Sequence, residues 1–187
     1  MDVVARDLAV MRDMLERMRA VARGWLESPP EGPGALVRET DAAGLRTWIR
    51  APDRRALLEA DELTTVGFFG QARHDVDHAP IHELEERIVE ALDDVAFVLS
   101  YFNLELPDAR YGNLVLCAAA GVPMSWRAHE LHSRAVALAP RHYHSARLHR
   151  GAVGSPLLGA GELVLRSTSY FDFDREPGEP AETSLWL

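Results

Sequence analysis

Apolar positions between residues 3 and 26 recur every three or four residues, which is the period of one face of a helix. Asp2 is a suitable N-cap for this helix, and Ser28-Pro29-Pro30 ends it. The apolar stripe is rich in methionine, and we expect it to pack in a core or against a second subunit. Its members are Val4, Leu8, Met11, Leu15, Met18 and Ala22.

From residue 63 onward the pattern alternates between strand-like and helix-like periods. The predicted elements are a strand at 64–71, a helix that begins after Asp77 with Pro80 in its first turn, strands at 97–104 and 111–117 separated by a Pro107-Asp108 break, a helix at 125–140, and strands at 145–153 and 162–173. On the first of these helices the glutamates at 83, 85, 86 and 90 mark the face expected to contact solvent.

The order strand, helix, hairpin, helix, strand is that of the β-α-β-β-α-β motif, so we predict an α+β, ferredoxin-like domain. Both helices of this motif cover one sheet face, which leaves apolar side chains on the other face. A second copy of the chain is the usual cover, and this predicts a homodimer. The predicted organisation is an N-terminal helix and linker region at 1–62 (with short strands near 36–37 and 47–49 and a helix at 53–60), the α+β domain at 63–175 and a C-terminal arm at 176–187.

Composition and charge narrow the classes of function. The net charge of −9 provides no basic field for phosphates, so we expect no nucleic-acid partner. No apolar run is long enough to span a bilayer, and charged residues interrupt any signal-peptide core near the N-terminus. The single cysteine, Cys117, lies in an apolar run and suits a reducing cytoplasm. All 20 Lys+Arg positions are Arg, which is typical of a GC-rich bacterial genome.

The later half of the domain carries a set of residues that resembles a known family. They are Trp126, His129, His132 and Ala135 on the second predicted helix, Tyr143, Ser145, Arg147 and Gly151-Ala152-Val153 after it, and Ser169-Tyr170-Phe171-Asp172-Phe173 at the end. This arrangement is similar to the closing half of antibiotic-biosynthesis-monooxygenase-like domains. The chain differs from the family pattern by its region 1–62 and by an insertion at 154–161.

The resemblance implies a dimeric α/β barrel with a pocket between the sheet and its helices. It also implies a cofactor-independent monooxygenase, an oxidoreductase of bacterial secondary metabolism that acts on an apolar or aromatic metabolite. Relatives of this fold include haem-binding proteins, so a haem enzyme with a histidine axial ligand is an alternative. A non-catalytic dimeric protein that binds a small ligand is a third reading, because function lies in the site and not in the fold.

Eight histidines are candidates for chemistry. His74, His78 and His82 are four residues apart, a spacing that would align metal ligands on a continuous helix. Pro80 interrupts this spacing, so we predict a solvated loop and no metal site. His132 lies at the edge of the buried face of the second helix, where it is either a pocket residue or a structural histidine.

The strand at 145–153 carries the strongest pair of candidate catalytic residues. Strict alternation places Tyr143, Ser145, Arg147 and His149 on one face, and Ala146 and Leu148 on the other. A histidine beside an arginine can hold an anionic substrate and move a proton near neutral pH. We therefore predict His149, Arg147 and His132 as catalytic residues; the alternative is that Arg147 and His149 pair with an acidic side chain across a dimer.

Polar and aromatic side chains on otherwise apolar strands are predicted to line the substrate site, because buried polar groups need partners and small-molecule sites combine aromatic walls with a few polar groups. An ordinary polar sheet surface is the alternative. The predicted substrate-binding residues are Phe68, Gln71, Tyr101, Asn113, Trp126, Tyr143 and Tyr170.

Overall fold

The structure of the protein is a computed structural model that describes residues 2–118, 129–175 and 182–186. The predicted start of the second domain helix at 125, and Trp126, lie outside these ranges. The described elements are α1 (Val3–Glu27), β1 (Ala35–Thr40), β2 (Arg46–Ala51), α2 (Arg54–Glu59), β3 (Leu63–Ala72), α3 (Ala79–Ala91), η1 (Leu92–Asp94), β4 (Val98–Leu106), β5 (Arg110–Ala118), α5 (Glu130–His142), β6 (Tyr143–Val153), β7 (Leu163–Asp172) and β8 (Glu182–Trp186).

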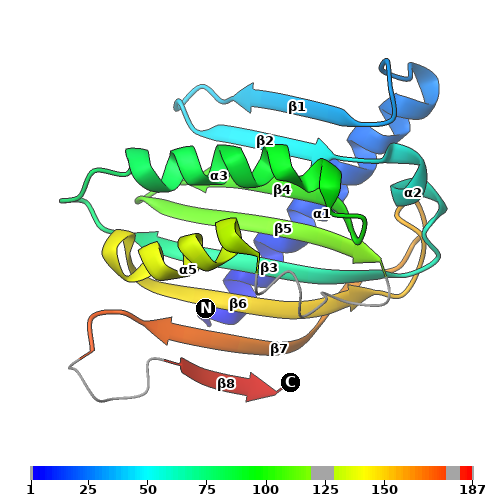
Figure 1. Cartoon of the computed structure of the whole chain (residues 1–187). Helices are drawn as coiled ribbons and strands as arrows, with labels where there is room; N and C mark the ends of the chain where they lie inside the picture. Colours follow the sequence, from blue (N-terminus) through cyan, green and yellow to red (C-terminus); the bar gives the residue numbers. More distant parts are fainter. Residues whose placement is uncertain (1, 119–128, 176–181, 187) are drawn as a thin grey trace.

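The described strands form one antiparallel sheet in the order β1-β2-β4-β5-β3-β6-β7-β8. Helices α3 and α5 lie side by side on one face, and α1 crosses the other face (Figure 1). The α+β class is thereby confirmed. Strands β1 and β2, expected near 36–37 and 47–49, extend the same sheet beside β4, so the described part of the N-terminal region, residues 2–62, shares the sheet and core with the rest of the chain. Strand β8, within the expected C-terminal arm, pairs with β7.

Helix α1 buries its apolar stripe on the sheet. Asp2 is the N-cap, as predicted, and its side chain accepts a hydrogen bond from the Val4 backbone at 3.4 Å. The methionines at 11, 14 and 18 are at most 1% exposed and pack in one core with Phe69 and Phe102. The sheet face that was expected to be bare, and therefore to need a second copy, is covered by a helix of the same chain.

Arg19 ties the insertion at 154–161 to α1. The residue is 6% exposed, and its guanidinium donates to the carbonyl of Leu157 at 2.7 Å and to that of Gly161 at 2.6 Å. Leu157 is fully buried in the same core. The insertion therefore packs against α1 as part of the fold. None of the helices in the described ranges is long and apolar enough to cross a bilayer.

Gly151 of β6 lies closer to its neighbour strand than any side chain allows. A Cβ at this position would lie 2.4 Å from the carbonyl oxygen of Val164 and 2.9 Å from the Thr65 hydroxyl, whereas a Cβ at Gly154 would meet no atom within 4 Å. We expect Gly151→Ala to lower the free energy of unfolding by about 1–3 kcal/mol through overpacking. The matched control Gly154→Ala is expected to change it by less than about 1 kcal/mol. Urea denaturation compares the two, and equal stabilities would contradict the close approach.

Candidate functional site

The predicted catalytic pair lies under α1. Arg147 donates from Nε to Asp7 Oδ2 and from Nη2 to Asp7 Oδ1 at 3.4 Å. His149 lies 3.1 Å from Asp7 Oδ2 through Nε2 and 2.8 Å from the Thr168 hydroxyl through Nδ1. Arg147, His149 and Asp7 are all at least nine-tenths buried. The acidic partner considered for this pair therefore exists, and it comes from α1 of the same chain rather than from across a dimer.

Asp7 is the charged centre of this buried cluster. Burial alone would raise the pKa of its carboxyl, but the hydrogen bonds from His149 and Arg147 and the charge of Arg147 outweigh that effect and hold the pKa below its ordinary value. Each polar atom that meets Asp7 is thus paired inside the protein. This arrangement fixes α1 on the sheet.

A bulge at the start of β6 separates Tyr143 from that pair. Gln71 pairs with Ser145, whereas the next residue, Ala72, pairs with Tyr143. His144 is therefore the extra residue of the bulge on β6 and has no pairing partner on β3. The strict alternation predicted for this strand is therefore wrong at Tyr143. Its ring lies on the opposite face, 5.5 Å from the Phe68 ring and 6.3 Å from the Tyr111 ring.

The sheet surface covered by α3 and α5, here called the α3–α5 face, brings four predicted substrate-binding residues together. Phe68 and Tyr143 meet edge to face. Asn113 accepts a hydrogen bond from the Phe68 backbone at 3.2 Å and donates to the Tyr101 hydroxyl at 3.4 Å. Polar groups and aromatic rings thus meet on one surface, which is the usual composition of a small-molecule site.

Glu85 of α3 completes this group, although its position in the helix suggested a solvent-facing residue. Its Oε1 accepts hydrogen bonds from the Tyr101 hydroxyl at 2.9 Å and from the Asn103 amide. Burial raises the pKa of Glu85, and these two hydrogen bonds offset the rise only in part. Burial and the nearby Glu85 also raise the pKa of Tyr101, so its hydroxyl remains a donor. The sequence feature that could have indicated this contact is the pair Tyr101 and Asn103 on β4, because both side chains need a hydrogen-bonding partner from the helix that covers them.

An apolar strip on the α3–α5 face remains half-buried. Its members are Val66, Phe68, Leu148 and Ala152, on the paired strands β3 and β6. Helix α5 provides little cover, because His142 is the only buried residue among its thirteen. The face that carries Glu85 therefore also carries apolar surface that is partly open to solvent.

Three imidazoles gather where α3 begins and α5 ends. The ring of His78 lies 6.1 Å from that of His82 and 5.5 Å from that of His142, and both α3 rings also meet Tyr111. His74, the third member of the predicted series, is exposed. No group of His, Cys, Asp or Glu in the described parts of the chain could hold a metal ion. An axial ligand needs a slot for the porphyrin beside it, and these rings pack on one another, so this cluster does not fit haem.

The remaining predicted residues lie apart from the α3–α5 network. Gln71 donates to the backbone carbonyl of Asp108 at 2.8 Å, in the turn between β4 and β5. Tyr170 pairs in register with Arg147 and so belongs to the α1 face. His132 is half-buried on α5. Burial raises the pKa of the Cys117 thiol to about 12, which suits the expected small hydrophobe and not a nucleophile.

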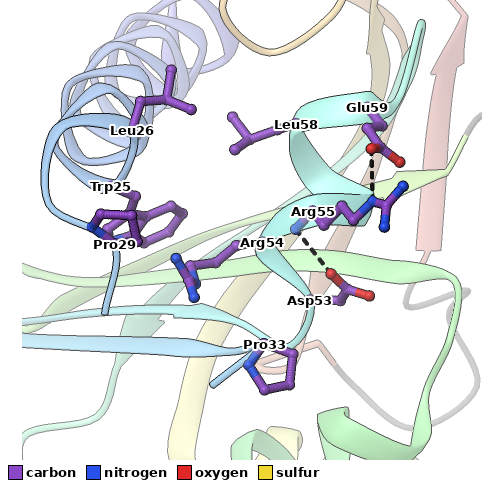
Figure 2. A pocket seen from close by; sticks show the side chains of 9 residues that line it. All are labelled: Trp25, Leu26, Pro29, Pro33, Asp53, Arg54, Arg55, Leu58 and Glu59. Carbon is purple, nitrogen blue, oxygen red and sulfur yellow. Dashed lines mark hydrogen bonds and ion pairs between the residues drawn. The ribbon is translucent and has the colours of Figure 1, made fainter. Parts of the chain in front are cut away.

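A separate hollow of about 530 Å³ lies between the end of α1, the following linker and α2 (Figure 2). Its charged groups are engaged within the chain: Asp53 caps α2 by accepting from the Arg55 backbone at 2.9 Å, and the Arg55 side chain pairs with Glu59 at 2.7 Å. Arg54 donates to the carbonyl of Pro30 at 2.8 Å. The hollow contains none of the predicted site residues, so the α3–α5 face is the better candidate for chemistry.

No protein-family model, curated protein or solved structure matches the chain.

Proposed function

We propose that this protein is a small-molecule enzyme that binds an apolar or aromatic metabolite on the α3–α5 face and oxygenates it without a cofactor. The observation that carries the proposal is Glu85: a carboxyl group with a raised pKa, held by Tyr101 and Asn103 beside aromatic rings and a half-buried apolar strip. Ionisable groups perturbed in this way are typical of functional sites. The activity itself is taken from the resemblance to antibiotic-biosynthesis-monooxygenase-like domains.

Glu85 is suited to remove a proton from the bound molecule. Its Oε1 accepts both hydrogen bonds, and Oε2 makes none with the described residues. A carboxylate with a raised pKa is a stronger base than an ordinary one. A substrate deprotonated at an activated CH₂ group is rich in electrons and reduces O₂ directly; one oxygen atom ends in a new carbonyl group, and the other leaves as water with both hydrogens. In this scheme Arg147 and His149, which the sequence predicted to be catalytic, hold α1 in position on the sheet.

The arrangement of the strands supports the finer fold assignment. The order β4-β5-β3-β6, with α3 and α5 on one face, is the one expected for a ferredoxin-like β-α-β-β-α-β domain. A homodimer remains part of the proposal, but it would use a surface other than the sheet face that α1 covers. We place the enzyme in the cytoplasm, where the buried thiol of Cys117 stays reduced.

A non-catalytic protein that binds a small ligand is the second candidate. One observation favours it: Tyr101, Asn103 and Asn113 already form a connected network with Glu85, so the polar groups are partly satisfied before any ligand binds. A connected network of this kind can have a purely structural role, which here would be to hold α3 on the sheet. Binding without turnover is the outcome that distinguishes this candidate.

The test uses 1-naphthol as a fluorescent binding probe and anthrone, which has an activated CH₂ group, as an oxidisable one. We expect the protein to bind both and to consume O₂ with anthrone. Glu85→Gln should lower the rate by about 10²–10⁴-fold, the usual contribution of a general base, while naphthol binding changes only a few-fold. The control is Glu86→Gln, at the exposed neighbouring position. The wild-type rate should rise as Glu85 loses its proton, with a midpoint above 4.5, its ordinary pKa.

Two results would count against the enzyme. Naphthol binding without O₂ uptake from anthrone or from a wider set of hydroxylated aromatics would favour the ligand-binding protein. Absence of binding for the whole set, or full activity in Glu85→Gln, would overturn the assignment of the site.

A further inference from the structure

We propose that the imidazoles of His78, His82 and His142 form a proton-sensitive clamp that joins α3 to α5 and releases the two helices when it is protonated. This inference concerns how the α3–α5 face opens, and it holds whether or not a ligand is turned over there.

The clamp joins the two helices that cover the face. His78 is the N-cap of α3, His82 lies one turn further along, and His142 is the last residue of α5. The His78 ring stacks on that of His82 with an interplanar angle of 25° and meets the His142 ring at 5.5 Å. The beginning of α3 and the end of α5 come together at one end of the pair (Figure 1), so these contacts close that end.

The packing around the rings favours their neutral form. His142 is 2% exposed, and neither of its ring nitrogens has a hydrogen-bond partner among the residues that the structure describes; the same holds for His82 Nε2. A neutral imidazole carries one N–H and one lone pair, whereas the charged form carries two N–H donors. Because a buried unpaired charge costs more than a buried unpaired neutral group, the closed clamp favours neutral rings. Water would pair with both donors in the open arrangement.

The third imidazole has one partner. His78 Nε2 lies 2.7 Å from the backbone carbonyl of Arg73, which can only accept, so this nitrogen carries the N–H. Protonation would add a second donor at Nδ1, on a ring that packs against those of His82, His142 and Tyr111. The cluster would then bring like charges together without an anion between them.

No carboxylate in the described ranges makes a hydrogen bond or ion pair with these three rings. Glu105 is bound to Arg46 at 2.6 Å, and Asp77 accepts from the Ala79 backbone at 2.9 Å. The charged and titratable groups that face the cluster are Arg46 of β2, Glu105 of β4, Tyr111 of β5, Glu86 of α3, Asp77 before α3 and Arg141 of α5. The cluster is therefore not a salt bridge that acid would strengthen.

The direction of the pH effect follows from this setting. Burial, together with the charge of Arg46 near His82 and that of Arg141 near His142, holds the pKa of both histidines below the ordinary value of 6.5. The open arrangement has ordinary imidazoles and binds protons more tightly. The closed clamp is therefore fully favoured above pH 6.5 and loses stability as the pH falls from there toward the lowered pKa values.

Hydrogen–deuterium exchange tests the clamp on the full chain, with rates corrected for the intrinsic effect of pH. Between pH 7.5 and pH 5.5 we expect amides of α3 and α5 to lose protection by up to about tenfold per pH unit for each histidine that gains a proton. Amides of α1 serve as the internal reference, because α1 lies on the other face. Equal losses in α1 and in α3 and α5 would mean general destabilisation and would overturn the clamp.

Variants separate the cluster from the other histidines. His142→Phe keeps a buried ring and removes its titration, so the protection of α3 and α5 should change less steeply with pH, by up to about one factor of ten per pH unit. His82→Leu provides the same test if His142→Phe does not fold. The control His74→Phe alters an exposed histidine and should retain the full pH dependence. Unchanged pH dependence in both cluster variants would refute the proposal.

Discussion

Replacing Asp7 with asparagine is expected to lower the free energy of unfolding by about 3–5 kcal/mol, the usual cost of removing one partner of a buried ion pair. The neutral amide would leave the guanidinium of Arg147 in a buried site without an anion, and would leave His149 with a weaker partner. The control is Asp13→Asn, on the same helix but exposed, where we expect a change within about 0.5 kcal/mol. Urea denaturation at pH 7 compares the two variants.

The same carboxyl group predicts a response to acid. In the folded protein the pKa of Asp7 lies below its ordinary value of 3.8, so its stabilising effect is present above that pH and is lost as the pH falls through the folded pKa. The wild type should therefore lose its advantage over Asp7→Asn below about pH 4. A loss of less than about 1 kcal/mol at pH 7, or an advantage independent of pH, would contradict the buried ion cluster.

Met14→Ala is expected to cost about 2–5 kcal/mol, because it leaves a cavity between α1 and the sheet. Met14 is fully buried in the core, whereas Leu26 near the end of α1 is 60% exposed. Leu26→Ala is therefore the matched control, with an expected change within about 0.5 kcal/mol.

Urea denaturation measures this loss, and it also tests whether α1 covers the sheet of its own chain or that of another copy. If α1 packs on its own chain, the denaturation midpoint of Met14→Ala and of the wild type should not depend on protein concentration. A midpoint that rises with concentration would show that the cover comes from another copy. Equal effects of Met14→Ala and Leu26→Ala would show that α1 does not form part of the core.

The elements of the fold were predictable because their signals are local. The periods that define α1, β3, α3 and β5 lie within short windows of sequence, and each element was found close to its expected bounds. The stripe on α1 showed that this helix needs a cover, but not which surface provides it. The contact of Asp7 with Arg147 and His149 depends on tertiary packing across most of the chain, and no short window contains it.

The candidate site was predictable to the extent that strand alternation is regular. Phe68 and Asn113 share a face by register, as alternation requires. Tyr143 lies on that face only because of the bulge beside it, which has no clear signal in sequence. Glu85 follows Leu84 on the helix, and the helical period predicted that its side chain faces solvent. Tyr101 and Asn103 on the strand below indicated the opposite, because both need a hydrogen-bonding partner. His142 joins His78 through the packing of two helices, and ligand spacing along one helix cannot reveal that.

The position of α1 also sets the order in which the protein can be completed during synthesis. Asp7 and Arg147 are 140 residues apart in the chain. At about 5–20 residues per second, the ribosome needs about 7–28 s to make Arg147 after Asp7. Strands β3 and β4, which carry Phe69 and Phe102 of the methionine core, are made before Arg147, so the apolar stripe of α1 can pack on them while Asp7 still lacks its buried partners. The ion pair that fixes α1 on the sheet can therefore form only after β6 has been made.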